Sequence, residues 1–167
     1  MFARSLRTST LRSSGLRFLS TEEGAVAAST NLKLTISVPG RVLVHDKEVE
    51  RVTLPGRGGT FGLESNSPPM VSELRPGTVL VEYGKGETEE FFIPGGFGFC
   101  NPNNSVTVSA PEGVSLDMID GDRVKAEADA IVARAATLEK GSAEAAKADV
   151  ELEVFKALGH ALKISVQ

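Results

Sequence analysis

Three side chains of this sequence belong to types that act as nucleophiles or transfer protons near neutral pH. They are Cys100, His45 and His160, the only thiol and the only two imidazoles in the chain. A thiol becomes an activated nucleophile when an imidazole lies within hydrogen-bonding reach. One histidine stands early in the chain and the other near its end, so nothing in the spacing predicts such a pair. We interpret the histidines as surface or strand-face residues and Cys100 as a small buried side chain, because cysteine is among the most buried residue types.

Glycines between Leu54 and Gly59 raise the possibility of a phosphate-binding loop. The segment reads Leu-Pro-Gly-Arg-Gly-Gly. A phosphate loop of this kind continues into Gly-Lys-Ser or Gly-Lys-Thr and opens a helix whose N-terminal amides hold the anion. Neither feature follows here. We therefore interpret the segment as turn glycines and expect no phosphate site.

Clustered carboxylates are the remaining candidates for chemistry. Glu89 and Glu90 are adjacent, and neighbouring residues of a strand point to opposite faces, so the two would not share a substrate. Asp117, Asp120 and Asp122 precede a predicted helix, where acidic side chains cap free amides. The regular ligand series and closing Glu of a calcium loop are missing. We expect no catalytic residue, no metal and no cofactor, which favours a binding or mechanical protein over an enzyme.

Composition excludes further classes of protein. The 167 residues carry 18 Lys and Arg against 22 Asp and Glu, which gives a net charge of −4. This balance provides no broad basic surface for phosphates, so we expect no nucleic-acid partner. A single cysteine forms neither an internal disulfide nor a multi-cysteine zinc site. The sequence has no run of 18 apolar residues and predicts no segment that spans a membrane on its own.

The first 20 residues have the composition of a mitochondrial or plastid import sequence. They contain no acid and four arginines: Arg4, Arg7, Arg12 and Arg17. The run from Arg17 to Ser20 looks like a matrix-protease cleavage site. We predict a cleaved import sequence over residues 1–19 and a flexible N-terminus over 20–30; a disordered basic tail is the alternative. Cleavage would leave 14 basic against 22 acidic residues, a net charge of −8.

Turn-forming residues then divide the rest of the chain in two. All eight prolines lie between Pro39 and Pro111, and 12 alanines lie between Asp120 and Gln167. We predict a β-domain over residues 31–118 and an α-helical hairpin over 119–167. The predicted strands are Leu32–Val38, Arg41–His45, Val49–Leu54, Thr78–Tyr83, Glu89–Ile93, Gly96–Cys100 and Ser105–Ser109. Turn residues separate them, including Asp46-Lys47, and short strands at this spacing indicate an antiparallel sandwich or barrel.

Helical periodicity predicts two α-helices in the last part. Apolar residues of the first helix follow the stripe Val124, Ala128, Ile131, Val132, Ala135 and Leu138. The second helix carries the stripe Ala146, Val150, Val154, Ala157 or Leu158, and Ala161. Asp120 and Ser142 are the predicted N-caps, and Gly141 breaks the pattern between the helices. Such a short break predicts an antiparallel hairpin.

Four stretches of the sequence resemble one family in their order and spacing. Gly59–Leu63, continuing through Pro69 to Leu74-Arg75-Pro76-Gly77, closely resembles a hallmark segment of the central-stalk subunit of F-type ATP synthases, called delta in mitochondria and epsilon in bacteria and chloroplasts. The other three stretches are Leu32–Val38, Pro94–Phe97 and Val114–Asp120. The resemblance covers about residues 31–163.

The resemblance implies a fold and a role. Members have a sandwich or flattened barrel of about ten strands before a two-helix hairpin. They are non-catalytic rotor subunits that bind the gamma subunit and the membrane c-ring and couple proton-driven rotation to ATP synthesis on other subunits. Mitochondrial members also bind a very small epsilon subunit. The implied place is the matrix face of the mitochondrial inner membrane, peripheral to it.

The resemblance also implies where the ring is contacted. The segment 57–66 matches the family region that rests on the c-ring, and we expect it to be a polar loop; an ordinary surface turn is the alternative reading. Its candidate contact residues are Arg57, Thr60, Glu64, Ser65 and Asn66.

Two departures from the family pattern concern possible sites. Many members have a histidine where Ser67 stands. Some bacterial members bind ATP through Ile/Leu-Asp-x-x-Arg-Ala at the start of the first helix, and this chain matches it at Ile119, Asp120 and Arg123 but has Val124 for Ala. The second helix has no arginine to hold a triphosphate, so we expect no nucleotide binding.

Two other functions compete with the rotor interpretation. One is a free-standing matrix β-sandwich that binds a small ligand or peptide, with the helices as a lid. The other is an enzyme that uses Cys100.

Overall fold

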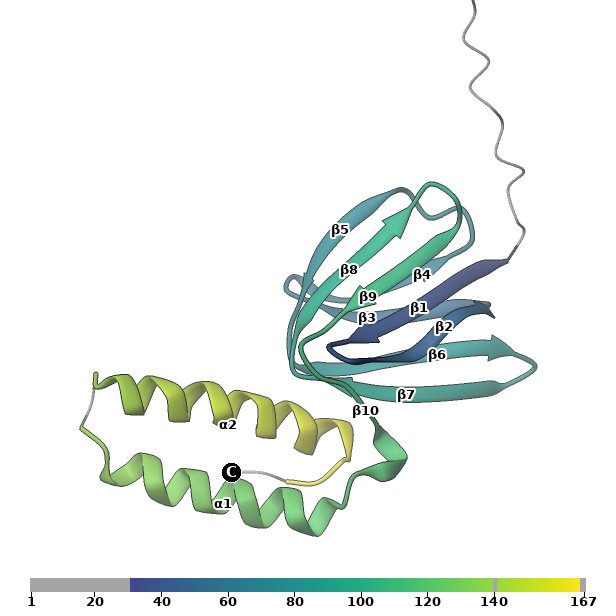
Figure 1. Ribbon diagram of the computed structural model, residues 1–167. Helices are drawn as coiled ribbons and strands as arrows, with labels where there is room; N and C mark the ends of the chain where they lie inside the picture. The colour runs from purple at the N-terminus through teal and green to yellow at the C-terminus, as the bar shows by residue number, and fades with distance from the viewer. Residues whose placement is uncertain (1–30, 140, 166–167) are drawn as a thin grey trace, which may run out of the picture.

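The computed structural model describes residues 31–139 and 141–165. It consists of a β-sandwich followed by a hairpin of two α-helices that lies at one end of the sandwich (Figure 1). The predicted fold class, an antiparallel sandwich or flattened barrel before a two-helix hairpin, is confirmed. The predicted import sequence 1–19 and the N-terminal segment 20–30 lie outside the described residues.

Ten strands build the sandwich. Their bounds are β1 Leu32–Val38, β2 Arg41–Val49, β3 Arg51–Gly56, β4 Gly59–Glu64, β5 Met70–Leu74, β6 Gly77–Gly84, β7 Glu87–Ile93, β8 Gly96–Asn101, β9 Ser105–Ser109 and β10 Val114–Ser115. They form one sheet in the order β10-β7-β6-β3-β5-β8-β9-β1-β2, with β4 paired to β3. Every pair is antiparallel except β1 with β9. The sheet folds over itself, and β2 near one of its ends contacts β6.

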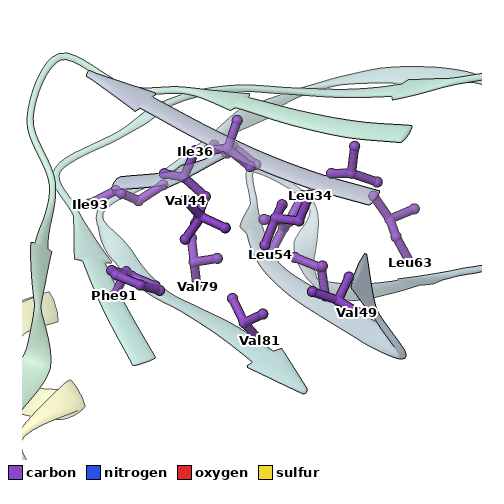
Figure 2. Close-up of a cluster of buried hydrophobic side chains, with 14 of the residues drawn as sticks. Leu34, Ile36, Val44, Val49, Leu54, Leu63, Val79, Val81, Phe91 and Ile93 are labelled. Carbon is purple, nitrogen blue, oxygen red and sulfur yellow. The ribbon is translucent and has the colours of Figure 1, made fainter. Parts of the chain in front are cut away.

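Alternation along the strands creates the core. In β1, Leu32, Leu34 and Ile36 are fully buried while Lys33 and Thr35 are partly exposed. Their side chains meet those of β2, β3, β6 and β7 in one apolar cluster (Figure 2). Burial of each such aliphatic side chain contributes about 1.5–3 kcal/mol relative to its exposure. Every residue of this cluster lies between positions 32 and 110, so the sandwich has a core that does not depend on the helices.

The structure corrects the predicted loop over residues 57–66. Gly59–Glu64 is strand β4 and pairs with β3 along its whole length, so only Arg57 and Gly58 form the turn between them. The prediction missed this strand because only Phe61 and Leu63 carry its alternation, and glycines occupy positions between and before them. Strand β5 was missed as well, since its residues Met70 and Val71 are exposed and show no alternation.

The predicted turn at Asp46-Lys47 is also wrong. Strand β2 continues through these residues to Val49, and its register against β1 shifts on the way. Asp46 has φ 45°, a conformation that aspartate tolerates better than most residues. The polar pair therefore marks an irregularity within a strand instead of its end, and a bend at Glu50 leads from β2 into β3.

The Gly95-Gly96 pair has a steric explanation. Both residues have φ near 140°, which side-chain-bearing residues rarely adopt. A Cβ atom on Gly96 would lie 2.3 Å from the carbonyl oxygen of Ser109, so the close approach of β8 to the end of β9 requires glycine. This is the physical basis of the Pro94–Phe97 motif in this chain.

The helices begin where the sequence predicts. A single 3₁₀ turn, Leu116–Met118, leads from β10 to α1 (Gly121–Thr137), which is followed by α2 (Ala143–Ala161). The side chain of Asp120 accepts a hydrogen bond from the amide of Asp122 (3.0 Å), and that of Ser142 accepts one from the amide of Ala145 (3.1 Å). Both predicted N-caps are confirmed.

The predicted apolar stripe is right for α1 and only partly right for α2, in which its second half, from Val154 to Ala161, is half-buried. In α1, Val124, Ala128 and Ile131 are buried, although Val132 is 38% exposed. The predicted stripe of α2 contains Val150, which is 63% exposed, whereas the buried residues of that helix are Ala148 and Gly159. The reason is that α2 has apolar side chains on more than one face, so periodicity alone does not select the buried one.

The hairpin is attached to the sandwich through few contacts. Helix α2 contacts β6, and α1 lies on the far side of α2 (Figure 1). Of the five ion pairs among residues 31–139 and 141–165, four lie within the sandwich and one, Arg134 with Glu151, joins the two helices. Open gaps of about 420 and 410 Å³ flank the last turn of α2. The two parts are therefore loosely joined.

Candidate functional site

Strand β4 separates the five residues predicted to contact the ring. Arg57 and Thr60 lie at the β3–β4 turn, and Glu64, Ser65 and Asn66 lie at the opposite end of the strand. At about 3.4 Å per residue, the two ends of β4 are about 17 Å apart. The five residues therefore do not lie on one loop, contrary to the prediction.

The β3–β4 turn is a polar tip held by one acidic partner. The Arg57 guanidinium donates to Glu73 Oε2 (2.9 Å), and its backbone amide donates to the Glu73 carbonyl (3.0 Å). This hydrogen bond and the carboxylate charge raise the pKa of Arg57 above its ordinary value. Gly58, Gly59 and Thr60 are exposed and carry no large apolar side chain. The tip therefore offers hydrogen-bonding groups and a fixed guanidinium.

A buried asparagine organises the other end of β4. Asn104 is 7% exposed and has φ 55°. Its side-chain oxygen accepts from the Asn66 amide (2.9 Å), and its carbonyl accepts from the Lys33 amide (2.9 Å). Three segments far apart in the sequence are thus joined at one residue. Sequence reasoning missed Asn104, because the pattern marks only a polar turn there.

Ser67 closes a tight turn. Its hydroxyl accepts from the Glu64 amide (3.0 Å), and its own amide donates to the Glu64 carbonyl (3.1 Å). The Cys100 thiol lies 3.7 Å from the Ser67 carbonyl. Burial raises the pKa of this thiol, which lowers its thiolate content. Cys100 is a buried residue, as predicted.

The two histidines and the cysteine lie on three different elements. His45 is exposed on β2, His160 is exposed on α2, and Cys100 is buried on β8. No hydrogen bond joins any two of them in the described part of the chain. Within the same residues, no group of three or more His, Cys, Asp or Glu side chains is arranged to hold a metal ion.

The bacterial nucleotide motif is used differently here. The Asp120 carboxylate is engaged as the N-cap of α1, and Arg123 lies exposed on the first turn of that helix. Ile119 is half-buried in the extended backbone before the cap. Asp120 therefore has a structural role at the start of α1.

One outer face of the sandwich carries large exposed apolar side chains among polar ones. Phe97 and Val71 are 52% and 67% exposed, and Val42, on the same side of the sheet, is 52% exposed. Cross-strand pairing places Val71 opposite Phe99, and Phe97 opposite Ser109. A groove of about 500 Å³ runs beside Phe97, bordered by Val38, Pro39 and Pro111 among others. Large exposed apolar side chains on one face mark an interaction surface.

An acidic cleft of about 750 Å³ lies at the end of the sandwich where β2, β4 and β6 end. Its lining includes four carboxylates and one guanidinium: Glu48, Glu50, Glu64, Glu82 and Arg51. Arg51 Nε lies 3.3 Å from Glu64 Oε1. The cleft is therefore negative overall.

A small polar cluster joins β2 to the β6–β7 hairpin. The Tyr83 hydroxyl donates to the Glu89 carboxylate, and Lys47 Nζ lies 3.8 Å from the centre of the Tyr83 ring. Lys47 is also within 4.0 Å of Glu89. Burial, followed by the hydrogen bond to Glu89 and its charge, raises the pKa of Tyr83 above its ordinary value. These contacts hold the closed side of the sandwich together.

Comparisons with known proteins agree on the family. Residues 31–115, about half of the chain, match the family described as ATP synthase, Delta/Epsilon chain, beta-sandwich domain. The chain is 38% identical over 120 residues to the mitochondrial ATP synthase F(1) complex subunit delta of Dictyostelium discoideum, covering 72% of this chain and 69% of that one. It is 32% identical over 137 residues to the mitochondrial ATP synthase subunit delta of Yarrowia lipolytica, covering 82% and 83%.

Solved structures support the fold. A chain from the OSCP/F1/c-ring structure of Euglena gracilis mitochondrial ATP synthase matches with a TM-score of 0.76 at 24% identity, covering 84% of this chain and 86% of that one. No helix in the described residues is long and apolar enough to cross a membrane. The sandwich, the hairpin and the sequence relationships together place this chain in the delta/epsilon family of ATP synthase subunits.

Proposed function

We propose that this chain is the delta subunit of a mitochondrial ATP synthase central stalk, a non-catalytic rotor part that links the gamma subunit to the c-ring. It turns with both and transmits proton-driven rotation to catalytic sites on other subunits. The single observation that carries this proposal is a rigid sandwich with two unlike free surfaces. One is the apolar face around Phe97, and the other is the polar β3–β4 tip.

Rigidity suits a torque-transmitting part. A close-packed core and continuous strand ladders resist shear, so force applied at one surface reaches the other with little deformation. The apolar cluster draws on strands from both halves of the sheet (Figure 2).

The apolar face is the proposed gamma contact. Permanent interfaces are more apolar than the average surface, and their binding energy concentrates in a few large side chains. Phe97 and Val71 are the exposed side chains that meet this description, and the groove beside Phe97 offers a pocket. Val42 extends the face across β9 and β1.

The polar tip is the proposed ring contact. Arg57 and Thr60 present a guanidinium and a hydroxyl at the end of a two-residue turn, which suits hydrated contacts with polar loops. We confine the proposed contact to this end of β4. Glu64, Ser65 and Asn66 lie at the other end of the strand and are not part of it.

Helix α2 offers a surface for a third chain, which we propose to be the small mitochondrial epsilon subunit. The α2 stripe that contains Ala146 and Val150 is exposed on the half of the helix that extends beyond the sandwich. Near Ala157 and Ala161 the same stripe faces the gap beside β6. A small chain lying in this angle would cover apolar surface on both parts. The proposed location is the matrix face of the inner membrane, consistent with the import sequence predicted for residues 1–19.

A binding experiment tests the proposal. Phe97→Asp places a charge in the apolar face and should weaken binding of gamma at least tenfold, measured by co-purification and by titration of purified gamma. Met118→Asp is the matched control, because Met118 is an exposed apolar residue that lies in none of the proposed contacts. Equal binding by wild type and Phe97→Asp would contradict the proposed contact. A monomer that binds neither gamma nor the c-ring but is stabilised by a metabolite would instead support the free-standing matrix binding module.

A further inference from the structure

Strand β4 has one free edge. It pairs with β3 on one side, and no other strand of residues 31–139 pairs with it. In particular, no hydrogen bond joins β4 to β5, the strand that follows it. Unpaired edges are normally covered or guarded in folded proteins.

The register identifies which backbone groups face outward. The two-residue turn is closed by the pair Gly56 and Gly59, so alternate residues from Gly59 onward exchange hydrogen bonds with β3. The Pro55 carbonyl supports this assignment, because it accepts from the Arg75 amide on the opposite side of β3. The amides and carbonyls of Thr60 and Gly62 therefore point away from β3 to the free edge.

These edge groups are exposed, and Thr60 also borders the open gap between the sandwich and α2. Thr60 and Gly62 are exposed, whereas the backbone groups of the next edge-facing residue, Glu64, are bonded to Ser67. The strand contains no proline or lysine, two residues that commonly block edges. A Cβ atom on Gly62 would lie 2.9 Å from Arg51 Nε. The Arg51 guanidinium therefore occupies the space that a side chain at position 62 would need.

The charge beside this edge is negative. Glu64, at the end of β4, lines the acidic cleft of about 750 Å³ together with Glu48, Glu50 and Glu82. Of these, only Glu64 forms one of the ion pairs, with Arg51. Strand β4 itself has no basic residue, so a second copy of it would bring no positive charge to the cleft.

We infer that the free edge of β4 binds an extended, basic segment of another polypeptide. The segment adds a strand next to β4, and its backbone exchanges hydrogen bonds with Thr60 and Gly62. A lysine or arginine of the segment lies beside Glu64, at the mouth of the acidic cleft. This site differs from the proposed gamma face and adjoins the proposed ring tip, with which it shares Thr60. Testing it requires only the isolated chain.

A synthetic probe tests the inference on the full chain. The probe is a nine-residue peptide of alternating valine and threonine with two central lysines, and the readout is amide hydrogen exchange of Thr60 and Gly62. Exchange of both amides should slow at least tenfold at saturating peptide. A peptide with glutamate in place of lysine should bind at least tenfold more weakly. Two further peptides carry N-methyl groups on the odd-numbered or on the even-numbered residues. Only one of them should lose binding, because only one set of alternating amides faces β4.

A matched pair of variants separates edge binding from folding. Thr60→Pro removes an edge amide that the fold does not use, and proline suits strand edges, so the unfolding midpoint should hold while peptide protection is lost. Thr60→Ala retains the amide and should still bind. The inference fails if the lysine peptide protects neither amide, or if Thr60→Pro binds the peptide as well as wild type does. It also fails if both amides become protected without peptide as the protein concentration rises, because the occupant would then be a second copy of the chain.

Discussion

The side chain of Asn104 shows what sequence reading leaves out at the scale of single residues. Asp120 and Ser142 were predictable as caps because their hydrogen-bond partners lie two and three residues away. Asn104 bonds to Asn66, 38 residues away, and to Lys33. Nothing in a local pattern reports such a partner. The predicted site residues were named correctly as polar, but their distribution over two ends of β4 depended on strand pairing.

Tyr83 gives a prediction at the same scale. It is the only tyrosine, and the chain has no tryptophan, so ultraviolet absorbance of the phenolate reports this one group. Burial raises the pKa of Tyr83, and the hydrogen bond to Glu89 and the charge of that carboxylate raise it further. In the folded protein Tyr83 should therefore titrate above pH 10, the ordinary value for tyrosine. The stability that this group contributes is complete below about pH 10 and is lost as pH rises toward the folded-state pKa.

The measurement is absorbance near 295 nm against pH, with and without denaturing urea. The titration in urea should return to about pH 10. Glu89→Gln removes the carboxylate charge and should move the folded titration part of the way down. A folded protein that titrates at the same pH as the urea-unfolded chain would contradict the contacts described for Tyr83.

At the scale of elements, the accuracy of prediction followed the strength of the hydrophobic pattern. Strands β1, β6, β8 and β9 alternate clearly or sit between glycine and proline turns, and each is present close to its predicted bounds. Strands β4 and β5 were missed, because glycines interrupt the alternation of β4 and the first two residues of β5 are both exposed. Helix α2 was placed correctly in sequence but its buried face was not, since only the position of α1 decides between its apolar stripes.

Helix α2 supports a prediction about close packing. Ala148 is 1% exposed in the seam between α1 and α2, whereas Ala146 is exposed on the same helix. Ala148→Leu should separate the helices and cost about 1–3 kcal/mol, because overpacking strains a filled contact. Ala146→Leu adds the same side chain at an open position and should change stability by less than about 0.5 kcal/mol. Thermal melting followed by helical circular dichroism compares the two, and equal midpoints would mean that Ala148 does not lie in the seam.

At the scale of the whole molecule, the structure has two parts: a sandwich whose core does not depend on the helices, and a hairpin that packs on the sandwich. The change in composition near residue 118 predicted the division, and the resemblance to a family supplied the role, which no single residue discloses. How closely the two parts are joined could not be predicted from the sequence. It depends on the contact of α2 with β6, which leaves a gap on each side of the helix.

Loose attachment predicts that the sandwich survives without the hairpin. A chain that ends at Ile119 keeps every residue of the apolar cluster, so its strand signal should unfold within about 4 °C of the full chain, equivalent to less than about 1 kcal/mol. The helices expressed alone as residues 119–167 should be largely unfolded, because short helices without a packed face are marginal in water. A truncated chain that fails to fold would show that the hairpin completes the core.

The parallel pairing of β1 with β9 bears on how the chain could cross a membrane. Lys33 pairs with Ser105, 72 residues later, so the first strand has no neighbour on that side until most of the sandwich has followed it. A chain threaded through a pore N-terminus first would emerge as an incomplete sheet with a long exposed edge, and contacts this distant in sequence form slowly. Translocation and folding would then be separated in time, and the emerging half would need a chaperone to keep its edge from other chains.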